Sequence, residues 1–349
     1  MTNSIADQAR LDFALTLRRQ WAGNLYPRLR AEYDAARANG DSVHPDGNAA
    51  EVIHALRSYA SFAWLERGSQ KLLWRAVSEA VEHEEPAEES TTGDSTLALD
   101  ADLVLPAWYT DWDIHLQPGG VWSDDRAARV YELGASLVML GDNDDYEFHR
   151  LFAATALPDR DYRCIVDLGC GFGKSTSPLK QKYPQAEVIG IDLSAPCLRL
   201  AARRANARGL RIHYRQAGAT ATGLERGSAD LVTSTMLLHE LPLDVLPGLF
   251  EEGARLLAPG GVLRFLDFHY TGDRFRDLAM TEHGTRNNEP YLAPMMAADV
   301  GAMARAAGLC AIRWRAFDER GPGLLERLEW PTRSEWHFPW AVLEAEKPR

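Results

Sequence analysis

Apolar and polar residues alternate in blocks through the second half of the chain, and the blocks predict strands and helices in turn. Short apolar runs at 164–166, 187–191 and 262–268 have the length and the branched composition of buried strands. Comparable runs lie at 212–216 and 228–232, and the longer segments between the runs favour helices. Such alternation is typical of an α/β fold with a parallel sheet.

The first 78 residues have helical periodicity instead. Leu17, Trp21, Leu25 and Leu29 recur in steps of four and share one helix face, and Pro27 predicts a break or kink there. Stripes of this kind indicate core or interface packing. The pattern divides the chain into a helical domain at 1–97 that ends in an acidic linker at about 79–97, a connecting segment at 98–154 and an α/β domain at 155–349.

Composition and charge narrow the class of protein. With 349 residues, 46% of them hydrophobic, the chain can build two domains with real cores. It has no apolar run of roughly 18 residues and no signal-peptide pattern, so we expect a soluble, cytoplasmic protein without a membrane partner. The net charge of −12 argues against a nucleic-acid partner and favours a small molecule. The four cysteines lack the spacing of a disulfide framework or a zinc site.

A glycine turn, D-L-G-C-G-F-G at 167–173, follows the first predicted strand. Gly169 and Gly173 can adopt backbone angles that a Cβ forbids, and Gly171 lets the main chain approach a ligand closely. The second strand ends in Asp192, about 25 residues after the acid that opens the turn. Doubly wound folds hold a ribose diol with a carboxylate at this place, so the pattern predicts a nucleotide-like ligand.

Together with G-I-D-L-S at 190–194, M-L-L-H-E-L at 236–241 and L-L-A-P-G-G at 256–261, the turn resembles the class I S-adenosylmethionine-dependent methyltransferases. The resemblance covers roughly residues 155–349. It implies S-adenosylmethionine as the cofactor and a Rossmann-like, seven-stranded doubly wound sheet. Strands at 309–317 and 336–345 would complete the sheet, the last one antiparallel. Small-molecule members often carry an N-terminal helical extension that dimerises or covers the acceptor pocket, so we expect the first 78 residues to mediate a homodimer or to cover the active site.

The resemblance also implies cofactor-binding residues. The three glycines of the turn would line the methionine and ribose portions, Asp192 would bind the ribose hydroxyls, and Asp167 would lie near the amino group. The third strand lacks the Asp-Ala pair that often meets adenine, so backbone at Gly218 and Ala219 must serve there. The full predicted set is Asp167, Gly169, Cys170, Gly171, Gly173, Asp192, Leu193, Gly218, Ala219 and Thr235.

The acceptor is expected at the carboxyl ends of the strands, beneath the segments 98–122 and 271–297. Methyl transfer needs a base only when the acceptor is protonated. The predicted catalytic residues are His239, His269, His115 and Tyr131. The predicted acceptor-binding residues are Tyr146, His149, Arg286 and Asn287, the arginine being suited to a carboxylate.

Each of these residues has alternative interpretations. His239 belongs to a sequence that is often structural in the superfamily, and 286–288 has the composition of an exposed turn. No metal is predicted, although His239, Glu240, Asp267, His269 and His283 offer a possible iron or zinc site. Aromatic residues that could form a cage for a cation, or could simply pack between domains, are Trp108, Tyr109, Trp112 and Trp122.

The sequence thus predicts an enzyme that methylates a small polar metabolite at O, N, S or C. The principal alternative keeps the cofactor but uses it for an intramolecular cyclisation or elimination that releases methylthioadenosine. A third is a non-catalytic cofactor-binding protein, which the intact turn and Asp192 disfavour.

Overall fold

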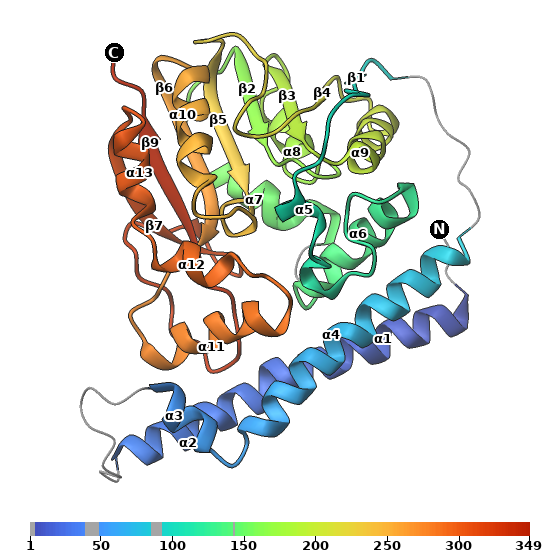
Figure 1. The fold of residues 1–349 in the computed structure, drawn as a ribbon, viewed down its shortest axis with the longest axis vertical. Helices are drawn as coiled ribbons and strands as arrows, with labels where there is room; N and C mark the ends of the chain where they lie inside the picture. The colour runs from blue at the N-terminus through green and yellow to red at the C-terminus, as the bar shows by residue number, and fades with distance from the viewer. Residues whose placement is uncertain (1–3, 39–48, 85–92, 142–143) are drawn as a thin grey trace.

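The computed structural model describes residues 4–38, 49–84, 93–141 and 144–349 (Figure 1). A single sheet runs through the molecule in the order β1-β4-β3-β2-β5-β6-β9-β7-β8. Its strands are β1 (Thr96–Ala98), β2 (Cys164–Leu168), β3 (Glu187–Asp192), β4 (His213–Gln216), β5 (Ala229–Thr235), β6 (Leu257–Phe268), β7 (Cys310–Asp318), β8 (Gly323–Leu324) and β9 (Trp340–Glu346).

The strand pairing confirms the predicted Rossmann-like sheet with its last strand antiparallel. Strands β2 to β6 pair in parallel, and β9 lies antiparallel between β6 and β7. The predicted count of seven strands was too low, because β1 and β8 extend the two edges. Both are very short, and β1 falls where the sequence predicted only an acidic linker. The middle of that linker, 85–92, lies outside the described residues.

Helices cover both faces of the sheet (Figure 1). The chain runs from β2 through β3 to β4 in one direction along the sheet and from β5 through β6 to β7 in the other. Right-handed crossovers therefore put the two sets of helices on opposite faces. The first set comprises α8 (Thr176–Lys182) and α9 (Ala195–Ala207), with α7 (Glu147–Thr155) packed on α8. The second set comprises α10 (Leu246–Leu256) and α13 (Val300–Ala306).

The predicted N-terminal helices are present. They are α1 (Ile5–Gln20), α2 (Tyr26–Ala38), α3 (Ala49–Ala55) and α4 (Tyr59–Glu82), with a π-helical turn η1 (Trp21–Leu25) between α1 and α2. The expected break at Pro27 takes the form of this wider turn, since proline lacks the N–H that an α-helix needs and its ring crowds the preceding turn.

Two hydrophobic clusters tie these helices to the rest of the molecule. Trp21, Tyr26 and Phe62 belong to the same buried cluster as the sheet, and Leu11 and Trp74 form a second one with α6 (Asp125–Val138). The helical part and the sheet therefore share apolar packing. The domain boundaries at 97/98 and 154/155 stay predictions.

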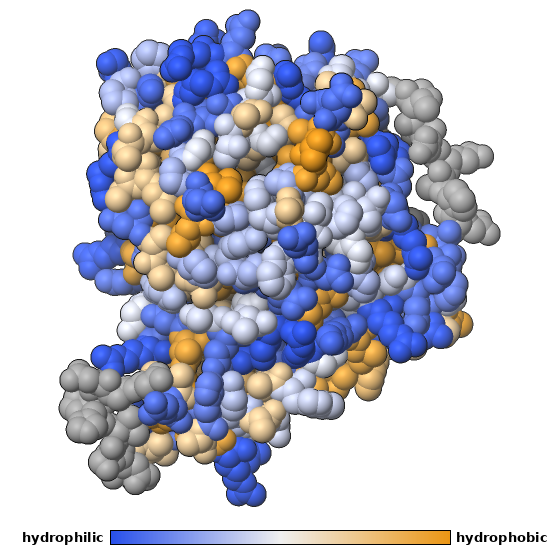
Figure 2. Space-filling view, viewed as in Figure 1, coloured by the Kyte–Doolittle hydropathy of each residue, from blue (hydrophilic) through white to orange (hydrophobic). Residues whose placement is uncertain are grey.

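Short elements between β1 and β2, after β5 and after β6 surround the carboxyl ends of the strands. They are α5 (Ala107–Thr110), η2 (Ile114–Leu116), η3 (Asp144–Tyr146), η4 (Leu238–Glu240), α11 (Arg274–Arg286) and α12 (Leu292–Ala297). Figure 2 shows apolar residues over the segment between β1 and α5, where Leu99 and Val104 are exposed. Within the described ranges, no helix is long and apolar enough to cross a membrane.

Candidate functional site

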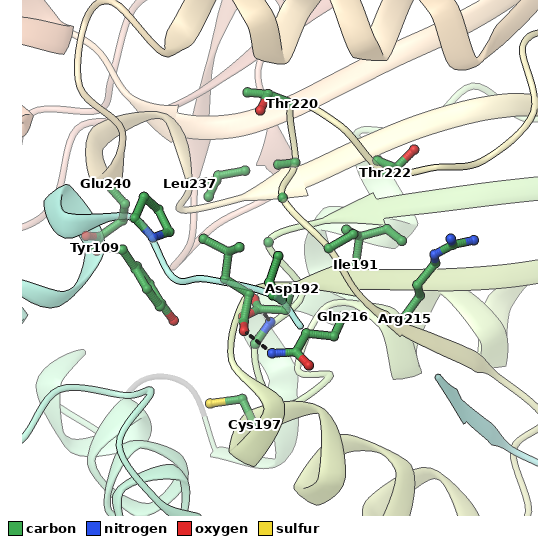
Figure 3. A pocket seen from close by; sticks show the side chains of 18 of the residues that line it. Tyr109, Ile191, Asp192, Cys197, Arg215, Gln216, Thr220, Thr222, Leu237 and Glu240 are labelled. Atoms are coloured by element: carbon green, nitrogen blue, oxygen red, sulfur yellow. Dashed lines mark hydrogen bonds between the residues drawn. The ribbon is translucent and has the colours of Figure 1, made fainter. Parts of the chain in front are cut away.

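A cavity of about 930 Å³ lies at the carboxyl ends of β2, β3 and β5. Its volume is at the upper end of the range for small-molecule sites, so it has room for a cofactor and a second small ligand. One wall consists of strand ends and the loops that follow them. The opposite wall is the cap segment, which we define as residues 98–122. Figure 3 shows Asp192 near the centre, with Tyr109 and Glu240 to one side and Gln216 and Arg215 to the other.

The glycine turn forms part of the first wall. Gly169, Gly171 and Gly173 have φ values of 69°, 53° and 83°, in the left-handed region that glycine tolerates best. The amides of Gly169 and Cys170 donate to the carbonyl of Ile191 at 2.8 and 3.0 Å, which fixes the turn against β3. Gly169 and Gly171 line the cavity. Gly173 instead packs against Tyr214, behind the wall.

Asp192, at the end of β3, joins the turn to the next loop. Its carboxylate accepts hydrogen bonds from the amide of Gly171 at 2.8 Å and from the amide of Ser194 at 2.8 Å. Burial raises its pKa, and the amides oppose that rise by stabilising the charged form. Asp192 also lines the cavity, so its oxygens are placed to accept hydrogen bonds from a ligand diol.

The cavity continues beyond Asp192 along the loop after β4. Leu193, Gly218, Ala219 and Thr220 line it there. The amide nitrogen of the Gln216 side chain donates to the carbonyl of Leu193 at 2.9 Å. Its oxygen accepts from the amide of Asp100 at 3.2 Å, which links this loop to the cap segment. This end has the backbone-rich lining that the sequence predicted for an adenine site.

Three further predicted cofactor residues lie behind the wall. Asp167 is fully buried and accepts from the hydroxyls of Ser175 and Thr176 at 2.6 and 2.7 Å. Burial raises its pKa to about 6. It therefore holds the chain that leads into α8 and does not reach the cavity. Cys170 and Thr235 are buried as well, and neither lines the cavity.

The other half of the cavity has an aromatic and acidic lining. Trp108, Tyr109, Tyr131, His115 and Glu240 all line it. Tyr109 is partly buried close to Asp192 and Glu240, and this burial raises the pKa of its phenol well above the usual range. The phenol therefore stays protonated and can donate a hydrogen bond to a ligand.

His115 lies between two carboxylates. Its Nε2 is 3.2 Å from Glu240 and its Nδ1 is 2.9 Å from Glu289. Burial alone would lower its pKa, but the two carboxylates raise the pKa to about 9. The imidazole is therefore protonated at neutral pH and donates a hydrogen bond to each carboxylate. A protonated histidine cannot serve as the base that the sequence predicted.

His239 lies behind Glu240. Its Nδ1 is 2.6 Å from Asp267 and its Nε2 is 3.4 Å from Glu240, and its ring packs on Phe268. Burial opposes protonation of His239, yet Asp267 raises its pKa well above the usual value. Burial likewise raises the pKa of Glu240, but His115 and His239 lower it by more, so Glu240 is ionised. The predicted base His239 thus supports Glu240 and does not face the cavity.

The structure does not bring the remaining predicted acceptor residues to the cavity. Arg286 forms ion pairs with Glu66 and Glu282, because α4 passes next to α11. Asn287 is fully buried and donates to the carbonyl of His283 at 2.8 Å. The segment 271–297, expected to overhang the acceptor, contains α11 and α12 and contacts the cap segment through Glu289.

Tyr146, His149 and His269 lie away from the cavity too. Tyr146 packs against Phe172 and Arg208. His149 is buried beside Phe148, and burial holds its pKa well below the usual value. The Nδ1 of His269 is 2.8 Å from the carbonyl of Tyr270.

The possible metal site is dispersed. Each histidine has a different partner. His283 pairs with Glu66 at 2.6 Å, His239 pairs with Asp267, and His269 lies next to the carbonyl of Tyr270. Among the described residues, no group of three or more potential ligands has the geometry to hold a metal ion. Of the four aromatic residues considered for a cage, Trp108 and Tyr109 line the cavity, whereas Trp112 and Trp122 do not.

Sequence reasoning missed three residues here. Glu240 was considered only as a metal ligand, and Glu289 was not considered as a partner of His115. Lys174 was overlooked, although it directly follows the glycine turn and is buried next to Tyr131. Its position directly after the glycine turn was the sequence feature that could have singled out Lys174.

Comparison with known proteins identifies the domain. Residues 165–261 match the family described as "Methyltransferase domain". The chain is 39% identical over 104 residues to a demethylmenaquinone methyltransferase of Thermus thermophilus, covering 30% of this chain and 46% of that one. It is also 39% identical over 108 residues to a trans-aconitate 2-methyltransferase of Deinococcus radiodurans, covering 31% and 38%.

A solved structure of Haemonchus contortus phosphoethanolamine N-methyltransferase 2 in complex with S-adenosyl-L-methionine has a TM-score of 0.48 at 17% identity, covering 70% of this chain and 61% of that one. The chain spans less than half the length of the two relatives named above. Residues 165–261 therefore match a methyltransferase domain, in agreement with the resemblance of the motifs to the class I S-adenosylmethionine-dependent methyltransferases.

We expect Asp192→Ala to weaken binding of S-adenosylhomocysteine at least tenfold, or about 1.4 kcal/mol. The change removes the carboxylate that faces the cavity and leaves the amide of Gly171 without its acceptor. Isothermal titration calorimetry measures the effect. Unchanged affinity would show that the ligand diol binds elsewhere.

Proposed function

We propose that this protein transfers the methyl group of S-adenosylmethionine to a small polar molecule bound between Trp108, Tyr109 and Glu240. The observation that carries the proposal is one continuous cavity. It joins the glycine turn and Asp192 to a second, aromatic and acidic half. The left-handed glycines and the accepting carboxylate fit the cofactor, and the second half leaves space for an acceptor beside it.

The residues of the second half can align an acceptor and exclude water. When bound, the cofactor supplies an electrophilic methyl group, and displacement at that carbon requires an in-line approach. The aromatic side chains of Trp108 and Tyr109 would confine the acceptor and keep water out. Glu240, which is ionised, would accept a hydrogen bond from the N–H or O–H group to be methylated.

His115 and His239 would keep Glu240 in place and ionised. Each is held by a second carboxylate, Glu289 for His115 and Asp267 for His239. With both histidines protonated, Glu240 is the group at this end of the cavity that can accept a hydrogen bond from the acceptor and orient it toward the methyl group. Trp108 and Tyr109 beside an ionised carboxylate favour an amine or a hydroxyl compound over a polyanion.

The product formed from the cofactor tests the proposal. Purified protein incubated with labelled S-adenosylmethionine and candidate amines and hydroxyl compounds should release S-adenosylhomocysteine in step with a methylated product. Release of methylthioadenosine would instead indicate intramolecular cyclisation or elimination. Tight binding without turnover over a broad acceptor panel would indicate a non-catalytic role. The cytoplasmic location, the homodimer and the absence of a nucleic-acid partner stay predictions.

A further inference from the structure

Lys174 is a buried ammonium group at the edge of the cavity. Its side chain is 8% exposed, and among the described residues it forms no ion pair. Its Nζ donates to the hydroxyl oxygen of Tyr131 at 3.2 Å and contacts the sulfur of Met236 at 3.6 Å. Tyr131 and Met236 line the cavity, so the ammonium lies directly behind its wall.

A buried ammonium without a counter-ion is costly, because a charge loses its hydration when it leaves water. The rings of Tyr131 and Phe172 lie 5.2 and 5.8 Å from Nζ, and the carboxylates of Glu240, Asp167 and Asp192 favour the charged form without forming an ion pair with it, so together they offset only part of that loss. Burial lowers the pKa of Lys174 to about 8, so it still carries its proton at neutral pH. The site thus holds a positive charge that an anionic ligand group would stabilise.

The direction of the hydrogen bonds shows where that anion would bind. An ammonium has only donors, so the oxygen of Tyr131 must be the acceptor. The hydroxyl proton of Tyr131 is then free to donate, and it forms no hydrogen bond to another described residue. The ring of Tyr131 packs next to Gly171, where an added Cβ would lie 3.5 Å from it. The donating hydroxyl is therefore close to the glycine turn.

We propose that Lys174 and Tyr131 form a carboxylate-binding subsite that holds the α-carboxylate of the methionine portion of the cofactor. This assignment rests on the proposed function, since the α-carboxylate is the one anionic group that S-adenosylmethionine brings. The two cationic side chains that line the cavity themselves are less suited. His115 is already neutralised by two carboxylates, and Arg215 is exposed beyond Asp192.

The subsite has a specific ligand requirement. S-adenosylhomocysteine carries the carboxylate, and its decarboxylated analogue keeps the amino group and the nucleoside but lacks the carboxylate. We expect Lys174→Met to weaken binding of S-adenosylhomocysteine about tenfold to hundredfold, the range of a lost hydrogen bond to a charged group. The analogue should bind the variant as tightly as the wild type or more tightly, because a repelling charge is gone. Calorimetry with both ligands on the full chain gives the four affinities.

Methionine is unbranched and of similar length, and it removes a buried charge, so the variant should fold. Its thermal midpoint checks this. Lys180→Met is a matched control, because Lys180 lies on α8, which follows Lys174, and donates to the carbonyls of Pro184 and Ala186, outside the cavity. Tyr131→Phe should reproduce part of the loss for S-adenosylhomocysteine and none for the analogue.

The pH dependence adds a readout that a structural role would not change. Binding of the carboxylate needs protonated Lys174, so wild-type affinity for S-adenosylhomocysteine should fall as the pH rises through about 8. Lys174→Met should lack that fall. The titratable groups around Lys174 are Tyr131, Glu240, Cys197, Asp167, Asp192 and His149, and all of them remain in the variant, which makes it the reference for their contributions.

The outcomes separate the two proposals. Equal losses for both ligands in Lys174→Met, or no loss for either, would overturn the subsite. A change confined to the KM of the acceptor would assign the carboxylate to the acceptor and overturn the assignment to the cofactor. Failure of the wild-type chain to bind either ligand would overturn the proposed function itself, and the subsite with it.

Discussion

Gly171→Val should abolish cofactor binding at concentrations where the wild type is saturated. Gly171 has a φ of 53° and lines the cavity, and its amide donates to Asp192. A valine there would project its two methyl groups between the turn and Tyr131, into space that the ligand needs. It would also strain the backbone, since a β-branched residue rarely adopts a positive φ. Titration with S-adenosylhomocysteine measures the loss.

Gly209→Val separates exclusion of the ligand from backbone strain. Gly209 follows α9, has a φ of 65° and has no atom within 4 Å of an added Cβ. The control introduces the same side chain at a similar φ, but Gly209 is exposed and lies outside the cavity. The control should lose some thermal stability and keep its affinity. Normal affinity in Gly171→Val would mean that the cofactor does not contact this turn.

The cofactor half of the cavity was predictable because a contiguous stretch of main chain builds it. Glycine at 169, 171 and 173 restricts the backbone to a turn, and the following strand ends in Asp192 within the same βαβ unit. The geometry of such a unit depends mainly on residues that are close together in the sequence. The turn does not reveal which of its side chains reach the ligand. Asp167 turned out to hold Ser175 and Thr176 instead.

The acceptor half depends on contacts between distant parts of the sequence. Arg286 has the composition of a free turn residue, yet Glu66 on α4, 220 positions earlier, pairs with it. His115 was predicted as a base, but it pairs with Glu289, which lies 174 positions later in the sequence and favours the protonated imidazole. No local pattern could show either pairing, because the packing of α4 and α11 decides both.

The two edge strands show a similar limit. β1 has three residues, of which the middle one is partly buried and the outer two are exposed, and β8 has two residues. Strands this short carry little periodicity. β1 forms because residues near it bind α9 and β4: the amide of Ser95 donates to Asn206, and the Thr96 side chain bonds to His213. That pairing brings the cap segment to the cavity.

Glu240→Gln should lower turnover by roughly two orders of magnitude, within the range for loss of a group that positions the acceptor. Glutamine keeps the shape of the side chain but removes the negative charge that holds and polarises the acceptor's N–H or O–H group. Affinity for S-adenosylhomocysteine should change little, because the glycine turn and Asp192 lie in the other half of the cavity. A steady-state assay together with calorimetry measures both quantities.

Two controls test the position of Glu240 as well as its charge. Glu225→Gln changes an exposed glutamate outside the cavity and should leave turnover intact. His269→Ala removes a histidine that the structure places away from the cavity, and it should also keep turnover, in contrast to the sequence-based expectation. If Glu240→Gln were as active as the wild type, the acceptor would not bind against Glu240. Loss of activity in His269→Ala instead would place the acceptor beyond β6, on the far side of Asp267.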